Sequence, residues 1–283
     1  MEEFAPSGPT LQRRRGARFR WTAVAIGLLC GALSALLGIS AGLLMVPLCM
    51  LLLRLNRAEA TATSLAAILA ITSAGALTYH LAGRAHGEVV WGVQAVLMVA
   101  VGEVVGALVG VRLAPPLRTG WPRRMLGVAL IASSVWVAVR IGSAPHVPRP
   151  EAQRAVAQLL AAGFFAGVFS SVAGIGGDVL VPGLLVLLLG FTQRLAQGLS
   201  LAVIPLASLL GTLLHLARGN VSGGMVGWLA LGGMVGSALV AQQVFRLPQE
   251  VLMGLYGTAL LVVGLNVILL TRNTKKTEEE GGP

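Results

Sequence analysis

The sequence predicts an all-α, polytopic membrane protein made of two homologous halves, which we expect to be inverted repeats with helices broken at glycine-rich segments in the middle of the membrane. Three observations predict this class. The 283 residues are 55% hydrophobic and 11% charged, with a mean hydropathy of +0.82, whereas a soluble domain has about 25% charged residues. Several apolar stretches reach the roughly 20 residues that a spanning helix needs. The same interrupted pattern also occurs once in each half.

The interrupted pattern joins a glycine cluster to a Val-Pro pair. The first copy is Gly38-Ile39-Ser40-Ala41-Gly42 with Val46-Pro47, and the second is Gly174-Ile175-Gly176-Gly177-Asp178 with Val181-Pro182. Glycine adds backbone freedom and proline removes a donor, so both interrupt a helix. In hydrocarbon, the freed backbone groups are costly unless they face protein or a polar cavity. Paired interruptions in two halves are typical of a transporter's binding site.

Ten apolar segments divide the chain into two series of five. They cover residues 21–37, 43–53, 60–81, 89–113 and 125–139, then 155–173, 179–190, 195–217, 226–245 and 251–270. We therefore expect a basic tail (1–20), a first repeat (21–140), a linker (141–154), a second repeat (155–270) and a polar C-terminal tail (271–283). The composition of that last tail predicts disorder.

Individual residues also recur between the halves in one register. The matched pairs keep a constant offset in the numbering, from which only the histidine pair departs, and by a single position: Gly27 and Gly163, Gly31 and Gly167, Ser64 and Ser200, Gly75 and Gly211, His80 and His215. Such register indicates an internal duplication.

The arginines favour one of two ways to thread each half. The segments that follow the breaks, 43–53 and 179–190, are too short to span the membrane alone. If the chain turns back at each break, the repeats are inverted and, with the two tails excluded, seven basic residues lie on the side of the termini and six on the other. A single kinked span makes the repeats parallel and gives five against eight. Because basic residues favour cytoplasmic loops, we expect inverted repeats and cytoplasmic termini.

Several functional classes are disfavoured by the sequence. The net charge is +10, but the basic residues lie between apolar segments and at the termini. This distribution is typical of membrane topology, so we expect no nucleic-acid partner. Cys30 and Cys49 both lie in apolar segments, which indicates small buried hydrophobic residues. Neither a Ser-His-Asp arrangement nor a His-Glu-x-x-His motif is apparent. We therefore expect that the protein is not an enzyme and that it binds neither a cofactor nor a metal.

The breaks themselves are the first candidate site. A helix that begins at Gly42 or Asp178 directs unpaired N–H groups and the positive end of its dipole into the protein, which favours an anion. Small residues allow a close approach, so we expect substrate contacts from Gly38, Ser40, Ala41, Gly42, Gly174, Gly176 and Gly177. The alternative role of such glycines is close helix packing, which we accept for most of the others.

Hydroxyl and ionisable side chains extend the candidate site. Thr63, Ser64 and Ser200 are expected to donate to the substrate, although such residues often bond their own backbone instead. Glu103 and Asp178 are candidates for proton coupling or gating because intramembrane acids are costly, with an N-cap as the alternative for Asp178. His80 and His215 are candidates for a proton relay, or else interfacial histidines. Weaker polar candidates are Ser73, Gln197 and Asn266.

These motifs resemble the sulfite exporter TauE/SafE family of bacterial inner-membrane permeases. The resemblance runs from about residue 27 to 270 and includes both breaks, the segment 56–65 with its Thr-Ser-Leu, and Ser73, Gly75, His80 and Gly83. The first glycine cluster is thinned, and the second Thr-Ser-Leu has become Leu199-Ser200-Leu201. The resemblance implies export or uptake of sulfite, thiosulfate, sulfonates or related anions, driven by the membrane or proton gradient without ATP.

The expected protein is therefore a multi-pass permease in a bacterial inner membrane, with a small anion, protons and the lipid bilayer as its partners. A passive anion channel of the same architecture is the alternative, and it differs in whether flux saturates and responds to a pH gradient. The sequence leaves open the choice of anion, the direction of flux, the coupling ion, and whether the chain is a monomer or a homodimer.

Overall fold

The computed structural model describes residues 16–88, 91–113, 120–139, 141, 152–173, 179–217 and 221–280. This part of the chain forms ten α-helices and a short 3-10 helix, and contains no strand. Their bounds are α1 Ala17–Leu37, α2 Gly42–Leu52, α3 Arg57–Ala85, α4 Val93–Leu113, α5 Gly120–Val139, α6 Ala152–Ala173, α7 Val181–Leu189, α8 Gln193–Leu216, α9 Gly223–Gln243, η3 Val244–Arg246 and α10 Gln249–Glu280.

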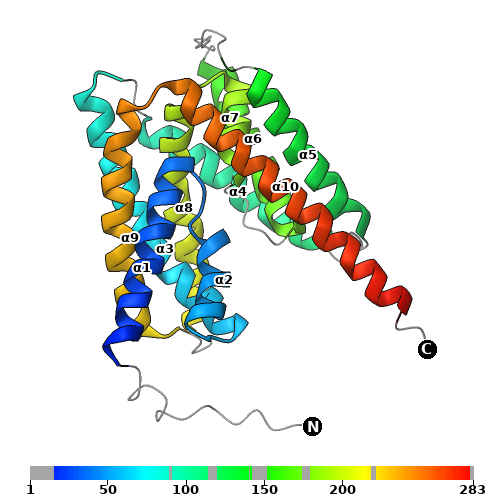
Figure 1. Cartoon of the computed structure of the whole chain (residues 1–283). Coiled ribbons are helices and arrows are strands. Elements are labelled where there is room, and N and C mark those ends of the chain that lie inside the picture. The colour runs from blue at the N-terminus through cyan, green and yellow to red at the C-terminus, as the bar shows by residue number, and fades with distance from the viewer. Residues whose placement is uncertain are drawn as a thin grey trace.

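The chain turns back at the first break. In Figure 1, α1 rises from the lower end of the molecule and α2 descends beside it, after which α3 rises again. Each half then has five helices that alternate in direction, so the second half starts from the opposite end. An odd number of passes makes the two repeats inverted, as expected, and the single kinked span is wrong.

Helix packing obeys the same symmetry. The main contacts join α1 with α9, α4 with α6, α5 with α10, and α3 with both α8 and α9. Exchanging the halves, so that α1 takes the place of α6 and α4 that of α9, converts the first of these contacts into the second. The same exchange maps the α5–α10 and α3–α8 contacts onto themselves. The duplicated sequence therefore folds into a pseudo-two-fold arrangement.

Two of these contacts are backbone to backbone. A Cβ atom on Gly31 would lie 2.1 Å from the carbonyl oxygen of Gly233, where α1 meets α9. A Cβ atom on Gly167 would lie 2.1 Å from the carbonyl oxygen of Glu103, where α6 meets α4. Glycine is required here because it alone lets two membrane helices approach so closely. The packing role predicted for most glycines is confirmed at these positions.

The duplication extends to helix caps. The Asn56 side chain accepts a hydrogen bond from the Glu59 amide at 2.8 Å, and the Thr192 hydroxyl accepts one from the Leu195 amide at 3.3 Å. Each is the N-cap of the long helix that follows the short one in its repeat. Thr192 stands opposite Asn56 in the register of the duplication, so α3 and α8 start in matched positions.

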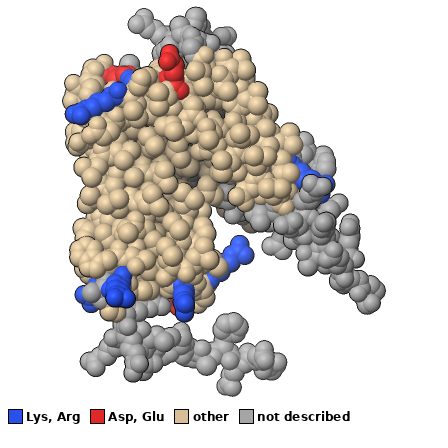
Figure 2. Space-filling view, viewed as in Figure 1, with Lys and Arg blue, Asp and Glu red and all other residues tan. Residues whose placement is uncertain are grey.

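The surface suits a bilayer. Six of the described helices are long and apolar enough to cross a membrane by length and composition. Figure 2 shows that charged residues gather towards the ends of the molecule, while the surface between them is uncharged. Large side chains such as Leu51 and Leu108 are exposed on that surface, as expected where lipid replaces water.

The C-terminal segment differs from expectation. We expected disorder after residue 270, but α10 continues to Glu280. Residues 271–280 contain neither glycine nor proline, and Lys275 and Lys276 each precede a glutamate one helical turn later, a spacing that supports a helix. In Figure 1, α10 ends at the same side of the molecule on which α1 begins.

A candidate anion site at the first helix break

The first break is a tight, internally bonded turn. Gly38 adopts a left-handed conformation with φ of +69°, and its amide donates to the Ser34 carbonyl at 2.8 Å. The Ser34 hydroxyl donates to the Ile39 carbonyl at 2.6 Å. The Gly42 amide donates to the Ser40 hydroxyl at 3.3 Å, so Ser40 serves the start of α2. Glycine is needed at position 38 because other residues rarely adopt this conformation.

The break lies deep within the molecule, against two long helices. Gly42 faces the side chain of Ile68, which lies near the middle of α3. Gly38 faces α8, where a Cβ atom would lie 2.7 Å from the Cα of Gln197. The start of α2 therefore lies against α3, and the turn that precedes it lies against α8.

Gln197 of α8 holds the break in place. Its Nε2 donates to the Leu36 carbonyl at 3.0 Å, a group that the end of α1 leaves without a helical partner. Its Oε1 accepts from the Tyr79 hydroxyl at 3.2 Å. The sequence marked Gln197 as a weak candidate and did not mark Tyr79, because neither bond follows from local spacing.

A polar stripe runs along α8 from this contact. Gln193, Gln197 and Ser200 are spaced by four and three residues, which places them on one helix face. We call these three residues the α8 stripe, and each is 0% exposed. Both amide atoms of Gln193 and the hydroxyl of Ser200 lack a hydrogen-bond partner within the described residues. Buried polar groups are normally satisfied, so the stripe can bind a polar ligand or water.

The other predicted hydroxyls are engaged in packing. Ser64 is fully buried and its hydroxyl faces the sulfur of Cys49 in α2 at 4.0 Å. Thr63 accepts a hydrogen bond from the Ser222 amide at 3.3 Å, which ties α3 to the connection before α9. Ser73 is exposed. Of the predicted serine and threonine contacts, Ser200 is therefore the one whose buried hydroxyl has no partner in the described part of the chain.

The two histidines lie near the matched ends of α3 and α8. The His80 ring packs against Trp91, with ring centroids 4.9 Å apart, and Trp91 in turn faces Gly198 beside the stripe. The Nδ1 atoms of His80 and His215 are both buried and have no partner among the described residues. His80 is thus close to the candidate site.

Of the two predicted acidic residues, Glu103 lies in the described part of the chain and Asp178 does not. Glu103 is 6% exposed and lies in the close contact of α4 with α6. The glycines on either side of it recur in α9 at the same spacing, as Gly232 and Gly236, so Gly233 occupies the place of Glu103 in the second repeat. Asn266 is exposed on α10. The second cluster lies outside the described residues: Gly174, Gly176, Gly177 and Asp178.

The structure describes the C-terminal side of the second break, from Val179 onward. The buried Tyr256 of α10 donates to the Val179 carbonyl at 2.7 Å and accepts from the Gly183 amide at 2.8 Å. It thereby caps α7, which has no side-chain cap of its own. Ile39 of the first break and Val179 belong to one apolar cluster together with residues of α5 and α10. Both breaks therefore border the same core.

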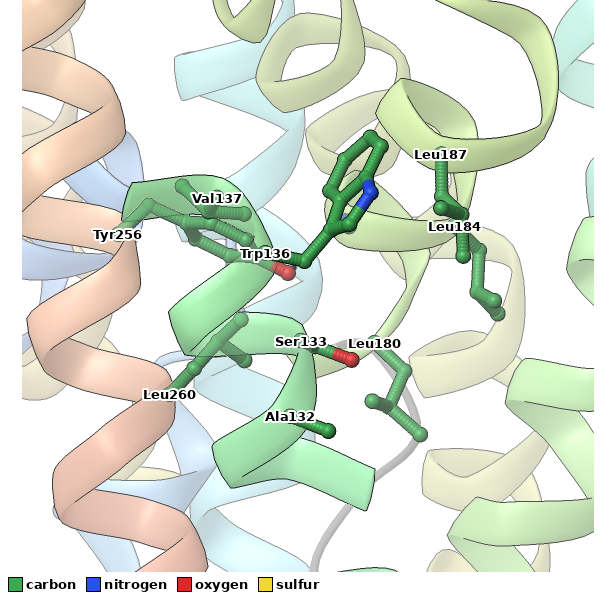
Figure 3. Close-up of a pocket in the computed structure, with 10 residues that line it drawn as sticks. Ala132, Ser133, Trp136, Val137, Leu180, Leu184, Leu187, Tyr256 and Leu260 are labelled. Carbon is green, nitrogen blue, oxygen red and sulfur yellow. Dashed lines mark hydrogen bonds between the residues drawn. The ribbon is translucent and has the colours of Figure 1, made fainter. Parts of the chain in front are cut away.

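A cavity of about 260 Å³ lies next to this second cap, between α5, α7 and α10. Figure 3 shows its lining, which is almost entirely hydrocarbon apart from Ser133, Trp136 and Tyr256. The Ser133 hydroxyl donates to the carbonyl of Ala129 in its own helix, and the Tyr256 hydroxyl is used in the cap. No charged side chain lines this cavity in the described part of the chain, so it does not suit an anion.

Comparison with known proteins places this architecture in context. The family model described as "Sulfite exporter TauE/SafE" matches residues 4–137 and 159–283, which covers both repeats. Among the curated proteins, none matches this chain.

Proposed function

Because the chain belongs to the sulfite exporter TauE/SafE family, we propose that it is a secondary transporter of small sulfur-containing or organic anions. Sulfite, thiosulfate and short sulfonates are the substrates to test first. We propose further that the anion binds between the first break and the α8 stripe. This assignment rests on two fully buried groups that lack a partner in the described part of the chain: the amide of Gln193 and the hydroxyl of Ser200. They belong to α8, which packs against the turn before α2.

The chemistry of this region suits an oxyanion. The N-terminus of α2 supplies the positive end of a helix dipole. The stripe adds an amide and a hydroxyl, both of which can donate hydrogen bonds. Such neutral donors bind an anion without holding it as firmly as a fixed cation does, and weak binding allows release after translocation.

Inverted repeats supply a route for alternating access. Transporters of this kind move one part of the molecule against another around a site at mid-membrane. The first break lies between α3 and α8, the helices that meet across the pseudo-two-fold axis. We propose coupling to protons through Glu103, with His80, His215 and Asp178 as further candidates. We also propose residence in a bacterial inner membrane, with both termini in the cytoplasm.

Flux through the purified protein in liposomes tests this function. We expect saturable uptake of sulfite, thiosulfate or a short sulfonate that increases with an imposed pH gradient. Gln197→Leu should abolish it, because the break loses its contact with α8, whereas Gln242→Leu at an exposed position of α9 should not. Flux that is linear in concentration and indifferent to pH would favour a passive channel, and equal flux through both variants would remove the site from the first break.

A further inference from the structure

Arg194 joins three segments of the chain at one end of the molecule. It is the second residue of α8 and follows Gln193, where the stripe begins. Its Nη1 donates to the Glu88 carboxylate in the connection between α3 and α4. Its Nη2 donates to the Leu247 carbonyl, in the connection between α9 and α10, at 2.6 Å. A single guanidinium therefore holds the two connections against the start of α8.

Aromatic side chains link this ion pair to the stripe. Phe245 of η3 packs edge-on against Tyr79, with ring centroids 5.0 Å apart, and stacks on His86 at 5.4 Å. Tyr79 donates to Gln197 of the stripe. The ends of α3 and α9 and the start of α8 thus close over the stripe, and its residues are 0% exposed.

The guanidinium has capacity to bind more than it holds. The Nε atom of Arg194 is buried and has no hydrogen-bond acceptor in the described part of the chain, like both amide atoms of the adjacent Gln193. Arginine offers five N–H donors in a planar array that matches an oxyanion with paired bonds. A small oxyanion with several acceptor oxygens, in the place of the Glu88 carboxylate, would satisfy the guanidinium at the end of α8 where the stripe begins.

The ion pair occurs at one end of the molecule and has no counterpart in the sequence of the other repeat. Ala58 stands in the first repeat where Arg194 stands in the second, in register with the matched caps Asn56 and Thr192. The α8–α9 connection, residues 217–222, contains no acidic residue to take the place of Glu88. Inverted repeats make the two ends alike by default, so this interaction distinguishes one end from the other.

We propose that Arg194 binds the transported anion by exchanging the Glu88 carboxylate for it. Its ion pair with Glu88 closes one end of the route to the α8 stripe, and the arriving oxyanion opens it by replacing the Glu88 carboxylate on the guanidinium. The exchange releases the α3–α4 connection while the guanidinium keeps an anionic partner throughout. Arg194 is thus the first residue to hold the substrate. This assignment rests on the proposed function, because it takes the transported anion as its ligand.

A distance measurement on the full chain in lipid tests the exchange. Spin labels on cysteines at positions 84 and 246, both exposed, report the separation between the end of α3 and η3, while the native cysteines are buried. Sulfite should shift this distance to longer values, and chloride at the same concentration should not. Glu88→Gln should show the longer distance without sulfite. Arg194→Gln should show it and no longer respond.

Glu250→Gln is the matched control, because Glu250 is exposed at the start of α10 near the same connection, and it should behave as the labelled parent. An unchanged distance in Glu88→Gln would overturn the closing role of the ion pair. A longer distance in Glu88→Gln with no effect of sulfite on the parent would overturn the exchange. The sulfite titration of the labelled parent needs neither Glu88→Gln nor Arg194→Gln, so it decides the exchange even if one of those variants fails to fold.

Flux measured on the same samples separates this inference from the proposed function. Transport of a sulfur anion without any sulfite-dependent shift contradicts the exchange at Arg194 and leaves transport intact. A sulfite-dependent shift without flux of any sulfur anion contradicts transport and leaves an anion-sensitive ion pair.

Discussion

Gln197 connects the first break to the second repeat by using both ends of its amide. The Leu36 carbonyl has no helical partner because α1 ends at Leu37, and Gln197 supplies the missing donor. Tyr79 fixes the other end of the amide from α3. A buried amide satisfied at both ends has one orientation, so this residue sets where the break lies relative to the stripe.

At the close contact of α1 with α9, Gly31→Ala should destabilise the protein by about 1–3 kcal/mol, because the new methyl group meets backbone that cannot rotate away. Thermal unfolding in detergent measures the loss. Gly227→Ala is the control on α9, where a Cβ atom meets nothing within 4 Å, and its stability should stay within about 1 kcal/mol of the parent or rise. Equal effects would mean that the contact does not govern stability.

Replacement of Glu103 by glutamine should flatten the pH dependence of flux while KM changes little, because the carboxyl group is buried away from the first break and its charge alone is removed. Initial rates of uptake across a range of external pH values provide the measurement. A pH profile that matches the parent would exclude Glu103 from coupling.

Local pattern predicted some site residues well and missed others for a physical reason. Gly38 and Gly42 follow from composition alone, since a broken helix needs them. The role of Thr63 in binding the Ser222 amide, and that of Tyr79 in binding Gln197, depend on segments that lie far apart in the sequence. Gln193 stands out because its buried amide lacks a partner among the described residues, which a sequence does not reveal.

The two short helices α2 and α7 begin and are capped differently: α2 begins at Gly42 as expected, whereas α7 begins only at Val181, later than the expected start at Asp178. In the first repeat, Ser40 of the turn itself accepts from the Gly42 amide. In the second, Tyr256 reaches across from α10 to bond the Gly183 amide and the Val179 carbonyl. The start of α2 is therefore capped from within its own turn, whereas the start of α7 is capped from α10.

Tyr256→Phe should lower stability by about 1–3 kcal/mol, because a buried amide and a buried carbonyl both lose their partner. Ser133→Ala serves as the comparison in the same cavity, since its hydroxyl bonds a carbonyl within its own helix, and it should be nearly neutral. Unfolding midpoints of the two purified variants measure the difference. A neutral Tyr256→Phe would show that water or the adjacent chain replaces the hydroxyl.

The elements themselves were largely evident from hydropathy. All ten apolar segments correspond to helices, because a stretch of hydrophobic residues in a bilayer has few alternatives to a helix. The prediction of disorder for the polar end of α10 was wrong, since composition alone does not distinguish a solvated helix from a disordered tail. The sequence allowed two paths for the chain at the first break, and the structure shows that the chain turns back there.

The arrangement of the whole chain makes a prediction that labelling can check. Cysteines introduced at positions 57 and 112 should react with an impermeant reagent from one side of the membrane, and those at 84 and 246 from the other. We expect the first side to be the cytoplasm, as the basic residues favour. Labelling of positions 57 and 246 from the same side would contradict the inverted threading, because a single kinked span in each half places both on one side.

Close glycine packing also decides which parts of this protein can move as units. The backbone contact of α1 with α9, and that of α6 with α4, each unite a helix from one repeat with a helix from the other. Backbones in such contact have no long side chains between them to absorb sliding. We therefore expect any conformational change to shift one mixed pair of helices against the other. Each moving body would then combine helices from both repeats, and the hinge would not follow the boundary between the two repeats.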